Sequence, residues 1–146
     1  MKNTLLLACG LLLTGIACQT ESLDIQRSFP FQLTIDPFPA SIPWQKPTSV
    51  GFGVKPTYIT SNNVYTFSWQ VAAPVRGVLL LNNKAVAPGA KTAVTASLNR
   101  VLSDTLTYVP TDSGAHEIRV RVFDSMGQAR DTTFTITAIR SNGNIK

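Results

Sequence analysis

The sequence predicts an all-β protein, a single β-sandwich of about seven strands. Three observations carry this prediction. Apolar and polar residues alternate along several segments, which is the period of half-buried strands. Turn-forming residues recur roughly every ten residues, as they do in sandwiches of short strands. No segment keeps a helical period for more than one or two turns.

Three strands and a proline-rich segment are expected in the first half of the domain. Alternation predicts strands over 31–35, 49–54 and 65–71. The segment 37–47 carries four prolines, and because proline has no N–H to give to a sheet, it is expected to be loop or sheet edge. Trp69 is in phase with its apolar neighbours and is expected to be the core tryptophan of the sandwich.

The second half is more regular. Asn82-Asn83 predicts a tight hairpin, because asparagine tolerates positive φ. Further strands are expected over 77–81, the return from Val86, 92–98, 106–108, 118–122 and 134–138. The phrase from Thr107 to Asp124 looks like the final strands of an immunoglobulin-like domain, so the expected fold is an immunoglobulin-like β-sandwich.

The N-terminus predicts export. Lys2 is followed by an apolar run and by the small-residue junction Gly15-Ile16-Ala17-Cys18, which is the layout of a secretory signal. A cysteine directly after Ala17 resembles a bacterial lipoprotein cleavage site, where Cys18 would receive the lipid. The alternative is cleavage by ordinary signal peptidase near Ala17, which would give a soluble periplasmic protein.

The expected organisation has four parts. Residues 1–17 are a signal peptide, and residues 18–28 are the lipidated cysteine and a flexible tether. Residues 29–140 form the sandwich, and residues 141–146 are a frayed tail. The expected location is the cell envelope, with the lipid on Cys18 holding the chain to the membrane and the domain facing the periplasm or the cell exterior.

Composition argues against several classes of function. The only cysteines are Cys9 and Cys18, and His116 is the only histidine, so an all-protein zinc site is not expected. The net charge of +5 comes from scattered basic residues, whereas nucleic-acid-binding proteins group them along one element. We therefore expect no metal, no cofactor and no nucleic-acid partner.

No motif predicts catalysis. His116 stands where a turn enters a strand, and no Gly-x-Ser-x-Gly motif accompanies it, so it is interpreted as a surface or half-buried structural residue. Asp112, Asp124 and Asp131 stand alone in the sequence and are interpreted as turn-capping acids more readily than as calcium ligands. The chain is expected not to be an enzyme and to have no small-molecule substrate.

Two aromatic residues are candidate partner contacts. Trp44 lies in the proline-rich segment, where it can anchor a partner or close the end of the core. Phe123 is out of phase with the apolar face of its strand and is expected to lie beside Arg119 and Arg121 on an accessible patch.

Both ends of the expected mature chain contain motifs that resemble those of a known protein family. Cys18, the Leu23-Asp24-x-Gln26 motif and Phe29-Pro30-Phe31 resemble the opening of the TraQ-type conjugal transfer proteins of Bacteroidetes conjugative transposons. The segments 106–110 and 118–128 resemble that family's last strands and its Asp-Ser-x-Gly-Gln hairpin. Residues 37–99 show no clear match.

The resemblance implies an exported accessory protein of a type IV-like mating apparatus, with no known active site. The first hypothesis is therefore a non-catalytic envelope lipoprotein that docks other proteins of the conjugation apparatus. The alternative is an envelope lipoprotein that recognises carbohydrate or a cell-surface ligand.

Overall fold

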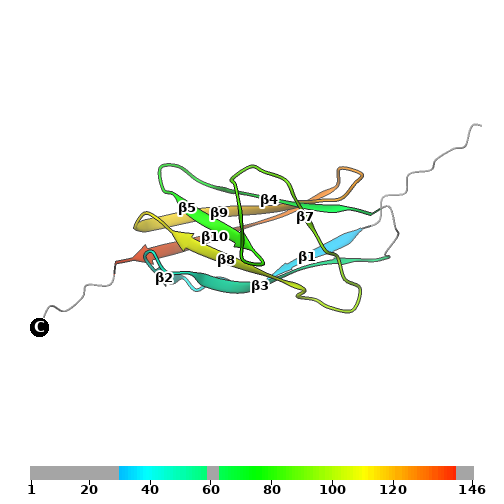
Figure 1. The fold of residues 1–146 in the computed structure, drawn as a ribbon, viewed down its shortest axis with the longest axis horizontal. Helices are drawn as coiled ribbons and strands as arrows, with labels where there is room; N and C mark the ends of the chain where they lie inside the picture. Colours follow the sequence, from blue (N-terminus) through cyan, green and yellow to red (C-terminus); the bar gives the residue numbers. More distant parts are fainter. Residues whose placement is uncertain (1–29, 59–62, 141–146) are drawn as a thin grey trace, which may run out of the picture.

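The computed structural model describes residues 30–58 and 63–140, and these residues form ten strands and no helix (Figure 1). The strands are β1 (Phe31–Ile35), β2 (Ser41–Pro43), β3 (Thr48–Pro56), β4 (Tyr65–Val71), β5 (Gly77–Leu81), β6 (Lys84–Val86), β7 (Thr92–Val94), β8 (Asp104–Pro110), β9 (Gly114–Phe123) and β10 (Ala129–Ile139). Seven of them have five or more residues, and β2, β6 and β7 have three each. The seven longer strands match the predicted number.

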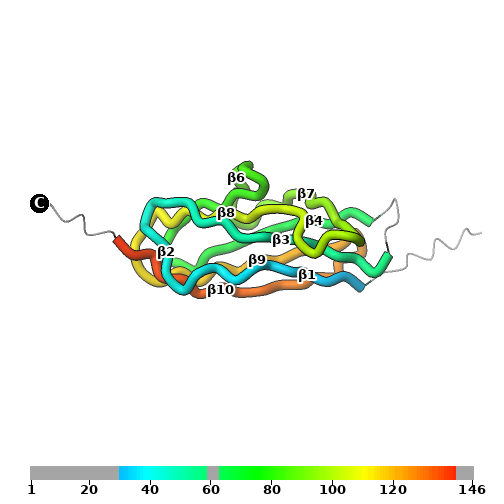
Figure 2. The backbone as a smooth tube through the Cα atoms, turned by 90° about the horizontal axis from the view of Figure 1, so that it is seen from below, coloured from blue at the N-terminus to red at the C-terminus, as the bar shows by residue number. Residues whose placement is uncertain are grey.

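Two five-stranded sheets pack face to face as a β-sandwich (Figure 2). The first sheet has the order β1-β3-β8-β5-β6, and all of its strand pairs are antiparallel. The second sheet has the order β2-β10-β9-β4-β7, in which only β2 and β10 are parallel. Consecutive strands such as β3 and β4, or β8 and β9, lie in opposite sheets, so the all-β sandwich prediction is confirmed.

The core lies between the two inner faces and follows the period-two pattern of the sequence. Every second residue is buried from Tyr65 to Trp69 of β4 and from His116 to Val122 of β9, because successive side chains of a strand point to opposite faces. Trp69 is 1% exposed and its indole Nε1 donates a hydrogen bond of 2.8 Å to the carbonyl of Val86. Trp69 is therefore the core tryptophan, as predicted, and its only polar group is satisfied.

The hairpin predictions are confirmed in their backbone geometry. Asn82 and Asn83 have φ values of 49° and 65°, and they join β5 to β6 as a two-residue turn. Gly127 has a φ of 82° in the turn between β9 and β10. These are conformations that asparagine and glycine adopt at low cost.

The segment after β7 differs from its prediction. The strand expected over 92–98 ends at Val94, and Leu98 is 41% exposed. The chain leaves β4 there and crosses to the first sheet, where Ser97 N donates to the Val54 carbonyl at 3.0 Å and Ser103 N to the Phe52 carbonyl at 3.0 Å. The alternation of apolar and polar residues could not show that residues 92–94 would pair with the second sheet and Ser97 with the first.

Two glycines of β3 make room for this crossing. A Cβ on Gly53 would lie 1.9 Å from the carbonyl oxygen of Val101, and one on Gly51 would lie 2.7 Å from a methyl group of Leu102. The Gly51-Phe52-Gly53 sequence therefore serves close packing of segment 95–103 on the first sheet.

The described chain enters and leaves the sandwich at opposite ends (Figure 1). β1 begins at the end that also holds the β9–β10 hairpin, whereas β2 and the last residues of β10 lie at the other end. The predicted signal peptide, Cys18, tether and C-terminal tail lie outside the described residues. Within residues 30–58 and 63–140, no helix is long and apolar enough to cross a membrane.

Candidate functional site

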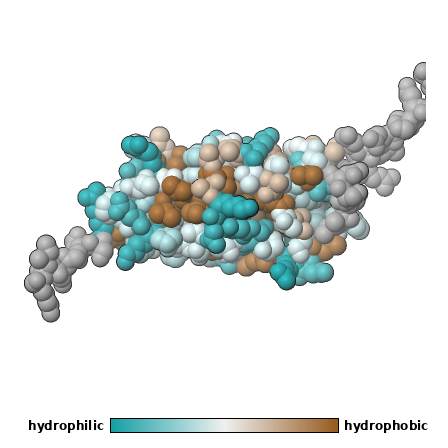
Figure 3. All heavy atoms as spheres, viewed as in Figure 1, coloured by the Kyte–Doolittle hydropathy of each residue, from teal (hydrophilic) through white to brown (hydrophobic). Residues whose placement is uncertain are grey.

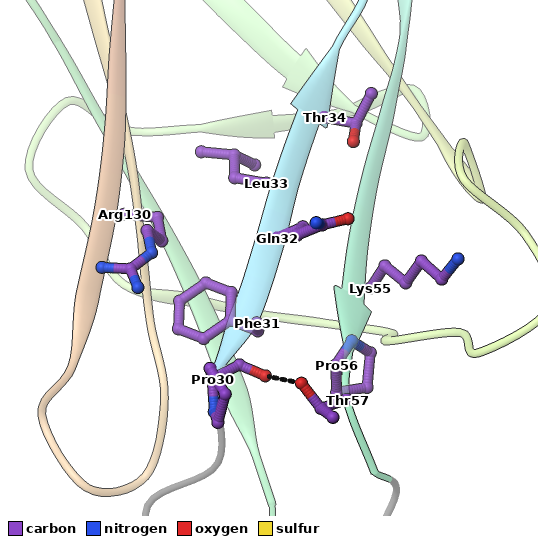
Figure 4. A pocket seen from close by; sticks show the side chains of 9 residues that line it. All are labelled: Pro30, Phe31, Gln32, Leu33, Thr34, Lys55, Pro56, Thr57 and Arg130. Atoms are coloured by element: carbon purple, nitrogen blue, oxygen red, sulfur yellow. Dashed lines mark hydrogen bonds between the residues drawn. The ribbon is translucent and has the colours of Figure 1, made fainter.

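The chain enters the domain beside an open groove along β1 (Figure 4). Its volume is about 680 Å³, and its lining comes from residues 30–34, residues 55–57 and Arg130. Thr57 holds the entry point, because its N and Oγ1 both donate to the Pro30 carbonyl, at 3.0 and 2.8 Å. The Arg130 guanidinium lies 5.9 Å from the centre of the Phe31 ring. The groove has cations but no carboxylate among the residues that line it.

Trp44 is fixed at the opposite end of the sandwich. It is half-buried, its Nε1 donates to the Thr111 carbonyl at 3.0 Å, and its own N donates to the Ile139 carbonyl at 2.8 Å. The Arg140 guanidinium lies 4.7 Å from the ring centre, within the range of a cation–π contact. The ring thus closes the end of the domain and still presents an accessible surface.

Phe123 lies on the outer face of the second sheet, half-buried, at the end of β9. Lys91 Nζ lies 4.9 Å from its ring centre and the Arg121 guanidinium 5.7 Å. Arg119 and Arg121 project from the same face of the strand, since they are two and four residues away. The structure therefore places Phe123 in contact with Arg121 and on the same strand face as Arg119.

One carboxylate from β10 neutralises part of this charge. Asp131 stands opposite Arg121 in the register and accepts hydrogen bonds from Arg119 Nε at 2.8 Å and from Arg119 Nη2. Arg121 Nη2 lies 3.5 Å from the same oxygen. The hydrogen bond from Arg119, together with both guanidinium charges, holds the pKa of Asp131 below its ordinary value.

Trp44 and Phe123 do not form a common site. Phe123 pairs with Ala129 at the start of β10, whereas Trp44 bonds to Ile139 at its end. Ten residues of extended chain separate those two points, about 33 Å at the rise of a β-strand. A single small ligand cannot reach both residues.

His116 is buried rather than on the surface or half-buried, which corrects the sequence interpretation of its exposure. It is 0% exposed, with Nδ1 2.8 Å from the Tyr108 hydroxyl and Nε2 2.9 Å from the Asp112 carbonyl. Because that carbonyl only accepts, Nε2 carries the proton and Nδ1 accepts from Tyr108. Both ring nitrogens therefore have structural partners, which leaves neither as a general base.

The acids act as turn and surface groups. Asp124 accepts the N–H groups of Met126 at 2.9 Å and Gln128 at 2.7 Å, which is the turn-capping role that the sequence predicted. The turn-capping interpretation is wrong for the other two acids: Asp112 accepts the N–H of Arg76, 36 residues away, at 2.8 Å, and Asp131 pairs with Arg119 from within β10. Among the described residues, no group of three or more His, Cys, Asp or Glu side chains is placed to hold a metal ion.

Several large apolar side chains are exposed. Figure 3 shows apolar residues on one face of the sandwich, interspersed with polar ones. Three of the exposed apolar residues belong to the crossing segment: Leu98, Val101 and Leu102. Val78 of β5 is also exposed. Val78 and Leu98 lie within the predicted strands 77–81 and 92–98, whereas Val101 and Leu102 lie outside every predicted strand, and none of the four was identified from the sequence as a contact.

No family model matches the chain, and no curated protein matches it. Solved structures do resemble it. A lipoprotein from Bacteroides thetaiotaomicron has a TM-score of 0.64 at 17% identity, with 86% of this chain and 92% of that chain covered. A conjugative transposon lipoprotein from Bacteroides eggerthii has a TM-score of 0.63 at 19% identity, with 75% and 98% covered.

A third structure, a conjugate transposon protein from Bacteroides vulgatus, has a TM-score of 0.61 at 19% identity and covers 86% of this chain and 98% of its own. Identities this low establish a shared fold. The alignments extend over nearly the whole of all three proteins, so the likeness concerns the complete sandwich.

Proposed function

We propose that this protein is a non-catalytic accessory component of a conjugative transfer apparatus, held in the cell envelope by a lipid on Cys18. The observation that carries the proposal is the fold shared with two proteins described as belonging to conjugative transposons. The Leu23-Asp24-x-Gln26 and Phe29-Pro30-Phe31 motifs support it independently, because they resemble the TraQ-type proteins.

The mechanism we propose is protein docking by a rigid domain on a lipid tether. Both nitrogens of His116 are engaged in structural hydrogen bonds, which is in keeping with a role in binding rather than in reaction chemistry. Trp44 and Phe123 are the proposed partner contacts, one toward each end of the sandwich. Fatty acyl chains would supply the anchoring at about 0.8 kcal/mol for each buried CH₂ group.

Deleting the gene from its mobile element tests this proposal. We expect the transfer frequency to fall and to return when the wild-type gene is supplied in trans. Normal transfer in the deletion strain would overturn the proposal, and it is also the result expected for the alternative, a lipoprotein that recognises carbohydrate or a cell-surface ligand.

Complementation with Cys18→Ala tests the anchor separately. We expect this variant to leave the membrane fraction and to restore transfer poorly, because the acyl chains provide the membrane affinity. A chain that stays with the membranes after this change would contradict lipidation at Cys18. Trp44→Ala is a second variant for the same assay. It should remain in the membrane fraction, and it should lower the transfer frequency only if Trp44 contacts a partner.

A further inference from the structure

A hollow on the outer face of the second sheet lies beside Phe123. Its volume is about 180 Å³, and its floor comes from β4 and β9. The residues around it are Ser68, Gln70, Arg119, Arg121 and Phe123, with Gly89 and Lys91 as a wall. The wall is held in place, because Gly89 N donates to the Trp69 carbonyl at 2.8 Å and β7 then pairs with β4.

The hollow has more positive than negative charge. Lys91, Arg119 and Arg121 line it, and Asp131 is the carboxylate that contacts the two arginines. Three cations and one anion leave a surplus of two positive charges. Asp131 reaches Arg119 and Arg121 from β10, on the opposite side from Lys91. The residues that line the hollow include no carboxylate near Lys91.

One donor of Arg121, a residue that lines the hollow, has no acceptor. The Nε of Arg121 is buried and has no hydrogen-bond partner among the described residues. A buried donor without an acceptor is unfavourable, so a ligand oxygen that reached Arg121 would relieve part of that penalty. The guanidinium fork suits a planar carboxylate, and the adjacent Ser68 and Gln70 add polar groups on the β4 side.

We propose that this hollow binds a carboxylate side chain on an extended, acidic segment of a partner protein. The charge surplus favours an acidic ligand, and the size of the hollow favours one side chain. Phe123 gives the methylene groups of that side chain an apolar wall. On this sheet face the short side chain of Thr133 lies opposite Arg119, and Glu117 follows opposite Thr135, so the charge favours an acidic side chain at the hollow and not beyond Arg119. The inference rests on the proposed docking function and names the chemistry of its partner.

Binding of two synthetic peptides to the purified full-length protein tests this inference. The first peptide has eight residues of alternating glutamate and threonine, and the second replaces each glutamate by glutamine. We expect the glutamate peptide alone to bind, with an affinity that falls as salt is added. Arg121→Gln and Lys91→Gln should each raise its Kd about threefold to tenfold, and the matched surface variant Lys84→Gln should leave it unchanged.

Asp131→Asn is a control for misfolding, because it is expected to strengthen peptide binding and a misfolded protein would not bind more tightly. It removes the competing carboxylate, so it should lower the Kd of the glutamate peptide about twofold to fivefold. Equal binding of both peptides, or an equal loss in Lys84→Gln, would overturn the inference. So would the case in which anionic phosphatidylglycerol vesicles, and not the peptide, bind in an Arg121-dependent way, because the hollow would then contact lipid.

The mating assay separates the two proposals. If the gene deletion lowers transfer while the glutamate peptide fails to bind, the acidic partner is wrong and the docking function stands. If the peptide binds as expected and the deletion transfers normally, the hollow is a genuine acidic-ligand site and the conjugation function is wrong.

Discussion

At the scale of single residues, Tyr108 and His116 form a buried polar contact in the core. Both side chains are 0% exposed, and the Tyr108 ring also packs against Trp69 with the ring centres 6.2 Å apart. Gly77 is required beside them, because a Cβ there would lie 2.1 Å from the Tyr108 hydroxyl. The sequence placed Tyr108 on a predicted strand, 106–108, but it could not show that Tyr108 would contact His116, since the contact joins two sheets.

Replacing Tyr108 by phenylalanine should lower the free energy of unfolding by about 1–3 kcal/mol, because it leaves Nδ1 of His116 buried without a donor. Chemical denaturation followed by tryptophan fluorescence measures the change. Thr135→Val on the exposed face is the control and should shift stability by no more than about 0.5 kcal/mol. A Tyr108→Phe protein as stable as the wild type would show that the hydrogen bond contributes nothing.

Alkaline pH should weaken the fold through the same residue. Burial, together with the nearby Asp112 charge, raises the pKa of Tyr108 from 10.0 to about 12. The folded state therefore favours the neutral phenol, so this contribution is complete below pH 10 and is lost as the pH rises toward 12. The expected loss is about 1.4 kcal/mol for each pH unit in that window.

Unfolding curves at several pH values in wild type and in Tyr108→Phe measure this effect. The variant should keep a weaker alkaline dependence, because burial and the Asp124 charge also raise the pKa of Tyr65. Identical pH profiles for the two proteins would contradict the role of Tyr108.

At the scale of elements, alternation predicted the long strands well and the short ones poorly. The buried faces of β1, β3, β4, β9 and β10 follow directly from period two. β2 has three residues in a proline-rich stretch and pairs in parallel with a strand distant in sequence, so no local pattern marks it. The arginines on the same face as Phe123 could be predicted from the alternation along one strand. The wall formed by Gly89 and Lys91 could not, because it depends on how a distant segment of the chain folds back onto the sheet.

Gly53→Ala tests the crossing of segment 95–103. The new methyl group would meet the backbone carbonyl of Val101, which cannot rotate away, so we expect a loss of about 2 kcal/mol or more of unfolding free energy. Gly89→Ala is the matched control: it has open space around it but a φ of 78°, and it should cost about 1 kcal/mol. Urea denaturation compares them, and a smaller loss for Gly53→Ala would show that the segment can move aside.

At the scale of the whole molecule, the sequence predicted the sandwich and the neighbours of Phe123 but not the relation between its candidate contacts. Trp44 and Phe123 lie toward opposite ends because β9 and β10 run the full length of the domain. That separation depends on strand length and direction, which alternation does not encode. The arrangement allows the domain to contact one partner near the end where the chain enters and another at the far end.

The entry and exit of the described chain at opposite ends have a mechanical consequence (Figure 2). Tension between Pro30 and Arg140 acts along the strands, so the hydrogen bonds that join β10 to β2 and to β9 bear the load together in shear. A pull across a strand pair would break such bonds one at a time. Single-molecule pulling from the two termini should therefore need a higher force than pulling from the C-terminus and a cysteine handle at position 83. Equal forces would exclude this load path.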